Sequence, residues 1–149
     1  MVAPGDLDRF LQLHKLPESF RRTAEEYYLP VADWLTACCK SGETFLLGIN
    51  GAQGTGKSTL ADFIKIALES SGEKTVAVLS IDDFYLTSAE RQVLGREKHE
   101  LLATRGAPGT HDIAMLTETL DALRSLGPGD VYHLPRFDKA SDDRALAAD

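Results

Sequence analysis

The segment from Gly51 to Ser58, GAQGTGKS, has the residue types and the spacing of a phosphate-binding loop, G-x-x-x-x-G-K-[ST]. In such a loop successive backbone N–H groups curl around phosphate oxygens, and glycines allow the dihedral angles that this needs. The lysine reaches the β- and γ-phosphates, and the serine hydroxyl is available to Mg²⁺. We therefore predict a site for ATP and Mg²⁺, with GTP not excluded, formed by Gly51, Ala52, Gln53, Gly54, Thr55, Gly56, Lys57, Ser58 and Thr59.

A pair of acids, Asp82 and Asp83, is the second candidate for chemistry, and it follows a predicted strand. Ligands of open parallel sheets bind beyond the carboxyl ends of the strands. Phosphoryl transfer to a hydroxyl needs a group that orients the attacking oxygen and accepts its proton. We assign that role to Asp82, and we expect Asp83 to act on Mg²⁺ through water or to cap the following turn. The alternative for the pair is a solvated turn with an N-cap.

Hydrophobic patterning predicts the elements that position these residues. Residues 44–50 and 75–81 are short apolar runs without polar alternation, which is typical of strands buried on both faces of a parallel sheet. Apolar residues at spacings of three and four predict helices over 18–40 and 57–71, with a kink at Pro30 or a division of the first into two shorter helices. Residues 87–104 are mainly helical in this interpretation. A further helix capped by Asp112 or Thr110 precedes a third strand at 131–134.

Strands that alternate with helices predict an α/β fold, with a P-loop NTPase-type parallel sheet flanked by helices. We expect an N-terminal helical segment at 1–42 and the core at 43–149. The net charge of −7, without a dense run of basic residues, argues against nucleic acid as a partner. No apolar run is long enough for a membrane span, and the start does not have the pattern of a secretory signal, so we expect a cytoplasmic protein.

Four segments carry a family resemblance: GAQGTGKSTL at 51–60, SIDDFYLT at 80–87, LLATRGAPGTHD at 101–112 and LPRFDKASDDR at 134–144. Over about residues 45–144 the chain resembles D-glycerate 3-kinases, a branch of P-loop kinases related to uridine kinase, phosphoribulokinase and pantothenate kinase. The first segment is common to many P-loop proteins. The S-x-D-x-F-Y pattern narrows the resemblance to the uridine kinase-like branch, and the last two segments are specific to the glycerate kinase-like group.

The resemblance implies a phosphotransferase with an alcohol group as acceptor, in which glycerate or a similar hydroxy acid is the partner. Lys57 and Asp82 are then the catalytic residues, and Ser58 and Asp83 the candidates for Mg²⁺. A small acid needs an arginine or lysine to meet its carboxylate. Each basic residue could instead be a solvated charge, His111 a donor to backbone, and Asp112 a helix cap. The implied acceptor site consists of Asp83, Tyr85, Arg105, His111, Asp112, Arg136 and Lys139.

Proteins of this kind continue well beyond the point that corresponds to Asp149, so we expect the chain to be truncated at its C-terminus. The continuation supplies a further strand with an acidic residue, a lid with arginine, and much of the adenine pocket. Two alternatives stay open: an incomplete or non-catalytic nucleotide-binding module, and a kinase for a nucleoside, pantothenate or a sugar phosphate. The sequence predicts neither a monomer nor an oligomer.

Overall fold

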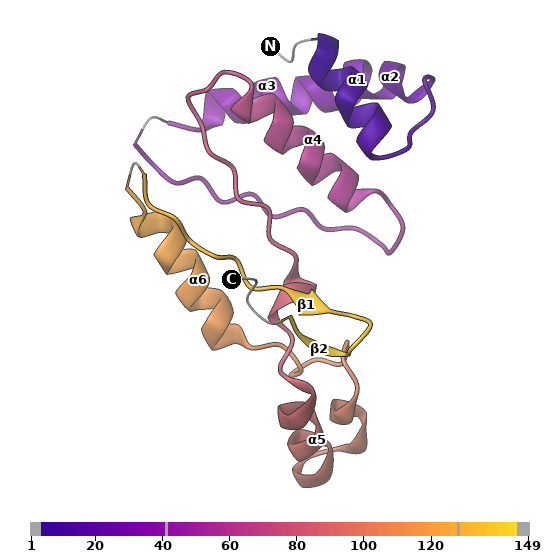
Figure 1. Ribbon diagram of the computed structural model, residues 1–149, viewed down its shortest axis with the longest axis vertical. Helices are drawn as coiled ribbons and strands as arrows, with labels where there is room; N and C mark the ends of the chain where they lie inside the picture. Colours follow the sequence, from indigo (N-terminus) through magenta and orange to yellow (C-terminus); the bar gives the residue numbers. More distant parts are fainter. Residues whose placement is uncertain (1–3, 41, 128, 146–149) are drawn as a thin grey trace. The chain divides into compact units, whose positions relative to one another are not determined.

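The computed structural model describes residues 4–40, 42–127 and 129–145. The chain divides into two compact units, residues 1–78 and 79–149, and each is described by itself (Figure 1). The predicted boundary at residue 42 therefore falls within the first unit, and it stays a prediction about sequence organisation. Within the described ranges, every helix is too short or too polar to cross a membrane.

The first unit is helical. It contains α1 (Pro4–Leu13), α2 (Phe20–Thr23), the π-helix η1 (Ala24–Tyr28), α3 (Leu29–Cys38) and α4 (Lys57–Glu69) (Figure 1). The helix predicted over 18–40 is present as α2, η1 and α3, which follow one another directly. Pro30 lies in the first turn of α3, and it cannot donate to a carbonyl in the turn before. The chain widens to the π form in that preceding turn, so the predicted irregularity at Pro30 is confirmed.

The core of the first unit joins α1, η1 and α3 to α4. Phe63 of α4 is 1% exposed. Its ring meets the rings of Phe10 and Tyr28 edge-on, each at a centroid distance of 5.3 Å. Full burial of such a side chain stabilises the fold by about 1.5–3 kcal/mol, and a well-oriented aromatic pair adds roughly 0.5–1.5 kcal/mol. The N-terminal helices therefore support the helix that begins at Lys57.

The predicted parallel sheet is not present in the described part of the chain, and this prediction needs correction. Residues 44–50 and 131–134 lie outside any helix or strand. The same is true of 75–80, and residue 81 begins a short helix. Phe45, Leu46 and Leu47 are 44–48% exposed, so they are not buried on two faces. From the predicted strand segments, Ile49 and Val76 are partly buried against the Leu35, Ile64 and Leu68 cluster of α3 and α4. Apolar composition favours a strand, but a strand also needs a hydrogen-bonded neighbour, which composition does not supply.

The second unit contains η2 (Ile81–Phe84), α5 (Ser88–Glu97), η3 (Glu100–Ala103), α6 (Ile113–Ser125) and two short strands. These strands, β1 (Phe137–Asp138) and β2 (Asp143–Arg144), are antiparallel, with Phe137 opposite Arg144 (Figure 1). Sequence patterning missed this hairpin because each strand is only two residues long and its residues other than Phe137 are polar. The helical prediction for 87–104 is confirmed by α5 and η3.

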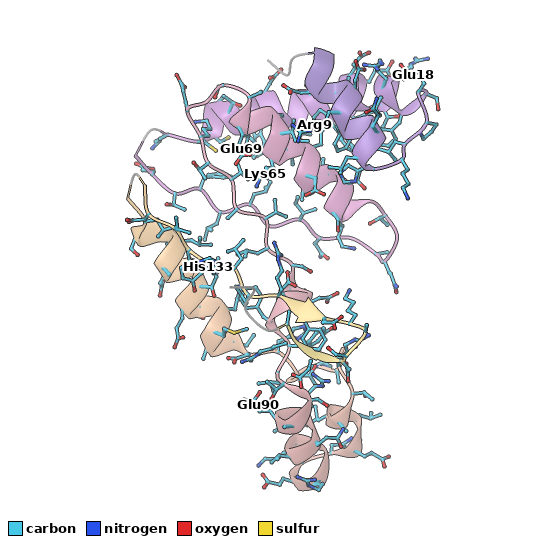
Figure 2. All side chains as sticks on the ribbon, in the orientation of Figure 1. Arg9, Glu18, Lys65, Glu69, Glu90 and His133 are labelled. Atoms are coloured by element: carbon cyan, nitrogen blue, oxygen red, sulfur yellow. The ribbon has the colours of Figure 1, made fainter. Side chains whose placement is uncertain are left out.

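Local capping fixes where α5 begins. Thr87 Oγ1 accepts a hydrogen bond from the Glu90 amide at 3.3 Å, and Glu90 Oε2 accepts one from the Thr87 amide at 2.8 Å. Figure 2 labels Glu90 at this first turn of α5. This reciprocal capping box satisfies two amides that the helix itself cannot. The capping box therefore sets where the chain leaves α5 toward the segment that carries the two candidate acids, Asp82 and Asp83.

Candidate functional site

The phosphate loop leads directly into α4. Gly54 and Gly56 have φ angles of +78° and +80°, in the left-handed region. A residue with a side chain adopts this conformation at a cost of roughly 1–2 kcal/mol, so the two glycines are there for a backbone reason. Gly56 is the N-cap of α4 and supplies no side-chain hydrogen bond. The first amides of α4 are therefore left to an anion.

The lysine of the loop lies over the loop's own backbone. Lys57 Nζ donates to the carbonyl oxygens of Gly51 at 2.9 Å and Ala52 at 2.8 Å. Thr55 Oγ1 also donates to the Ala52 carbonyl, at 2.8 Å. The left-handed glycines, the helix start without a side-chain cap and an ammonium held at the loop fit a polyphosphate group.

Ser58 is exposed in the first turn of α4. A magnesium ion commonly takes one or two protein oxygens together with substrate phosphates and water, and this hydroxyl fits such a role. The structure describes no cluster of three or more His, Cys, Asp or Glu side chains that could hold a metal ion by itself.

Asp82 in the second unit is paired with a lysine from the hairpin. Lys139 Nζ donates to Asp82 Oδ2 at 2.7 Å. The hydrogen bond from Lys139 holds the pKa of Asp82 below its usual range, although partial burial acts in the opposite direction. The carboxylate is therefore ionised at neutral pH, which suits a group that orients a hydroxyl by accepting its hydrogen bond.

Asp83 points its carboxylate at the start of β1. Its Oδ2 accepts from Arg136 at 2.9 Å, and its Oδ1 accepts from the Phe137 amide at 3.2 Å. The cap of η2 is Ser80, whose Oγ accepts from the Asp82 amide at 3.3 Å. Asp83 thus anchors the PRFDK segment, and its proposed action on Mg²⁺ stays a prediction.

Tyr85 and His111 form an isolated antiparallel bridge between the two loops of the predicted acceptor site. Their rings stack at a centroid distance of 4.2 Å and an interplanar angle of 25°. Burial, and next the negative charge of Asp82, raises the pKa of the Tyr85 phenol. Residues 26 positions apart in sequence are held face to face in this way, and the phenol stays protonated at neutral pH.

Asp112 caps α6 as predicted. Its Oδ1 accepts from the Met115 amide at 2.9 Å, and its Oδ2 accepts from Arg144 at 2.7 Å. Arg144 Nε also donates to the Tyr85 carbonyl at 3.2 Å. Both carboxylate oxygens of Asp112 are engaged, so the geometry favours the capping interpretation over contact with an acceptor.

The basic residues of the predicted acceptor site differ in how they are used. Arg105 donates to the carboxylate of Asp142 and to the Lys139 carbonyl, the latter at 3.4 Å. Arg136 is paired with Asp83, as described above. Lys139 has a side chain that is 60% exposed and forms an ion pair with Asp82. The structure therefore places in one unit the predicted catalytic residue Asp82 and all the predicted acceptor-site residues: Asp83, Tyr85, Arg105, His111, Asp112, Arg136 and Lys139.

Sequence reasoning missed Arg91, a fully buried residue of α5. Its guanidinium donates to the Leu86 carbonyl, to the Asp142 carbonyl at 2.9 Å and to the Asp142 carboxylate at 2.6 Å. The charged pattern of residues 87–104 is typical of a solvated helix, so it concealed a buried arginine. The sequence pointed to Arg91 only indirectly, because its partner Asp142 lies in the segment LPRFDKASDDR at 134–144 that carries the family resemblance.

Comparison with known proteins shows which families and proteins the chain is similar to. The family "Methylmalonyl Co-A mutase-associated GTPase MeaB" matches residues 29–94, which is less than half of the chain. The chain is 41% identical over 101 residues to "Uncharacterized kinase mug58" of Schizosaccharomyces pombe, covering 66% of this chain and 36% of that one. It is 34% identical over 153 residues to "D-glycerate 3-kinase, chloroplastic" of Arabidopsis thaliana, and the match covers 92% of this chain and 33% of that one.

A second kinase and a solved structure are also similar to this chain. The chain is 26% identical over 132 residues to the pantothenate kinase of Streptococcus gordonii, covering 88% of this chain and 40% of that one. Among solved structures, "Structure of YGR205w protein" is similar with a TM-score of 0.62 and 32% identity, covering 83% of this chain and 44% of that chain.

The phosphate loop is that of a P-loop protein, and the family match and the solved structure are consistent with this class. The chain is a homologue of P-loop kinases, among them D-glycerate 3-kinase and pantothenate kinase, as the sequence resemblance predicted. It spans about a third of the length of the curated relatives it matches first.

Proposed function

We propose that this chain acts in an ATP-dependent small-molecule kinase, which transfers the γ-phosphate to a hydroxyl of glycerate or a similar hydroxy acid. The observation that carries the proposal is the pairing of Asp82 with Lys139. One carboxylate that can orient a hydroxyl and one exposed cation that can meet a carboxylate lie 2.7 Å apart. A small hydroxy acid such as glycerate presents a hydroxyl and a carboxylate only one or two carbons apart. The similarity to D-glycerate 3-kinase supports the same substrate class.

Each residue has a distinct task in this proposal. The amides of the loop and of the first turn of α4 hold phosphate oxygens, while Lys57 exchanges its two carbonyl partners for the β- and γ-phosphates. Ser58 offers its hydroxyl to Mg²⁺. Bound Mg-ATP supplies the phosphoryl group. Asp82 orients the acceptor hydroxyl and takes its proton, and the loose transition state of phosphoryl transfer demands little basicity from it.

Lys139 links acceptor binding to the state of Asp82. While it donates to Asp82, the ammonium keeps the pKa of that carboxyl low. When an acceptor carboxylate takes over the ammonium, Asp82 loses its strongest partner and its pKa rises, which makes the carboxylate a better proton acceptor.

A second acceptor class is supported by a specific finding, the similarity to the pantothenate kinase of Streptococcus gordonii. Pantothenate also carries hydroxyl groups, on which Asp82 would act in the same way. Its carboxylate lies at the far end of the molecule from them, so this acceptor would not use the Asp82–Lys139 pair as a small hydroxy acid does. The two acceptors differ in size, and a direct assay separates them.

The test is a coupled ADP-release assay on this chain with Mg-ATP, in the absence and presence of D-glycerate or pantothenate. We expect release that depends on glycerate. Release with pantothenate alone would overturn the acceptor assignment. If neither acceptor stimulates release while Lys57→Ala still abolishes ATP binding, the chain is a nucleotide-binding module. Lys65→Ala, on the same helix α4, is the matched control for the binding measurement (Figure 2).

Asp82→Asn tests the catalytic residue. This variant keeps the shape of the side chain and removes its proton-accepting charge. We expect ATP affinity to be unchanged and turnover to fall by a factor of about 10²–10⁴, the usual contribution of a positioned acid or base. Unchanged turnover would exclude Asp82 from the reaction.

A further inference from the structure

The turn of the hairpin contains one residue with an unusual backbone and an unusual number of partners. Asp142 has a φ of +55°, in the left-handed region where Asp and Asn are the side chains tolerated best after glycine. Its Oδ2 and its carbonyl oxygen accept from Arg91, and its Oδ1 accepts from Arg105. Three acceptor atoms of a single residue thus receive two guanidinium groups.

The two arginines also share the ring of Phe137. The guanidinium carbons of Arg91 and Arg105 lie 5.5 and 5.8 Å from the ring centroid. Burying a guanidinium is unfavourable unless the charge is matched and its donors are used. Arg91 is fully buried and Asp142 supplies the matching carboxylate. We call Arg91, Asp142 and Arg105 the arginine clamp.

The clamp acts on the residue that carries the acceptor-binding cation. Arg105 donates to the Lys139 carbonyl as well as to Asp142, so both ends of the turn are held by one guanidinium. The carboxylate of Asp138 closes the same turn by accepting from the amides of Ala140 at 2.9 Å and Ser141 at 3.2 Å. With its backbone fixed, Lys139 has only its own side chain to place when it reaches Asp82.

We propose that Asp142 is a positioning residue, which through Arg91 and Arg105 fixes the hairpin turn so that the Lys139 ammonium is presented to Asp82. The placement of Lys139 follows from the contacts of the arginine clamp alone. The consequence for acceptor binding rests on the proposed function. Arg105 accordingly serves to hold the turn and does not have to meet the acceptor itself.

Asp142→Gly is the informative variant, because glycine accepts the left-handed φ and removes the carboxylate. The matched control is Ser141→Ala, one position away in the same turn, where the hydroxyl makes a hydrogen bond of 3.5 Å to the Asp138 carbonyl. Asp142→Asn keeps the preference for the left-handed backbone and an oxygen that can accept from one arginine. This variant should therefore keep part of the wild-type positioning of Lys139.

The readout is the NMR signal of the Lys139 ammonium, recorded well below the unfolding temperature, with the amide spectrum as proof of folding. A hydrogen-bonded ammonium exchanges its protons with water slowly enough to be seen. We expect this exchange to accelerate at least about tenfold in Asp142→Gly, to change less in Asp142→Asn, and to stay at the wild-type rate in Ser141→Ala.

A folded Asp142→Gly or Asp142→Asn protein with an unchanged Lys139 signal would overturn the proposal, since a purely structural role would lower stability without freeing the lysine. The steady-state kinetics add a second test: the KM for the acceptor should rise while the KM for ATP stays constant. An altered Lys139 signal in a chain that phosphorylates neither glycerate nor pantothenate would support the positioning role and reject the proposed function.

Discussion

Asp112 joins the start of α6 to the end of the hairpin, so its removal tests two interactions at once. Asp112→Ala removes the cap on the Met115 amide, which is worth about 1 kcal/mol. It also removes the ion pair with Arg144. The side chain of Asp112 is 22% exposed and that of Arg144 is 30% exposed. Solvent screening limits such a pair to about 1 kcal/mol. We therefore expect a loss of about 2 kcal/mol for Asp112→Ala and about 1 kcal/mol for Asp112→Asn, which can still cap the helix.

The pH dependence separates this loss from a general packing effect. The hydrogen bond from the Met115 amide, and then the one from Arg144, hold the pKa of Asp112 below its usual range. A group with a lowered folded-state pKa stabilises the fold fully above its unfolded-state pKa of about 3.9. This stabilisation is lost as the pH falls through the folded-state pKa. The difference between wild type and Asp112→Ala should therefore shrink on acidification.

The assay is urea unfolding followed by circular dichroism at pH 7 and at acidic pH, together with hydrogen exchange of the Met115 amide as a local probe. Asp121→Ala is the control, because it removes an exposed carboxylate from the same helix, whose contact to Arg124 is long at 3.9 Å. We expect a cost below about 0.5 kcal/mol for the control. Equal costs for Asp112→Ala and Asp121→Ala, or a Met115 amide with unchanged protection, would refute the assignment.

Two glycine substitutions test the backbone arguments. Gly56→Ala should lower the free energy of unfolding by about 1–2 kcal/mol and weaken ATP binding, because an L-residue is strained at φ +80°; Gly48→Ala, where an added Cβ meets nothing within 4 Å, is the control, and equal unfolding curves would contradict the argument. Gly95→Ala should cost about 1–3 kcal/mol, because the added Cβ would lie 2.8 Å from the Cβ of Ala103 and α5 would have to move away from η3. A thermal unfolding midpoint at the wild-type value would show that this close contact does not matter.

The helices could be predicted because their signals are local. The apolar stripe of α4, the cap at Asp112 and the charged run of 87–104 each need only a few neighbouring residues, and each prediction is confirmed. The strands could not be predicted in the same way. A strand requires a partner that is distant in sequence, and the runs at 44–50 and 75–81 have the composition without the ladder. The polar β1–β2 hairpin was missed for the opposite reason, because the side chains that hold it come from α5 and from residue 105.

The phosphate loop was predictable from the sequence alone, since the positive φ angles and the lysine belong to eight consecutive residues. Short segments also predicted an acceptor region, and that assignment stays a prediction. The contacts among those residues are a matter of the tertiary structure. It pairs Asp82 with Lys139, assigns Asp83 to Arg136, and buries Arg91 against Asp142, across separations of more than 50 positions. Such pairings depend on which charged side chains the fold brings within reach of one another, and a linear pattern does not contain that information.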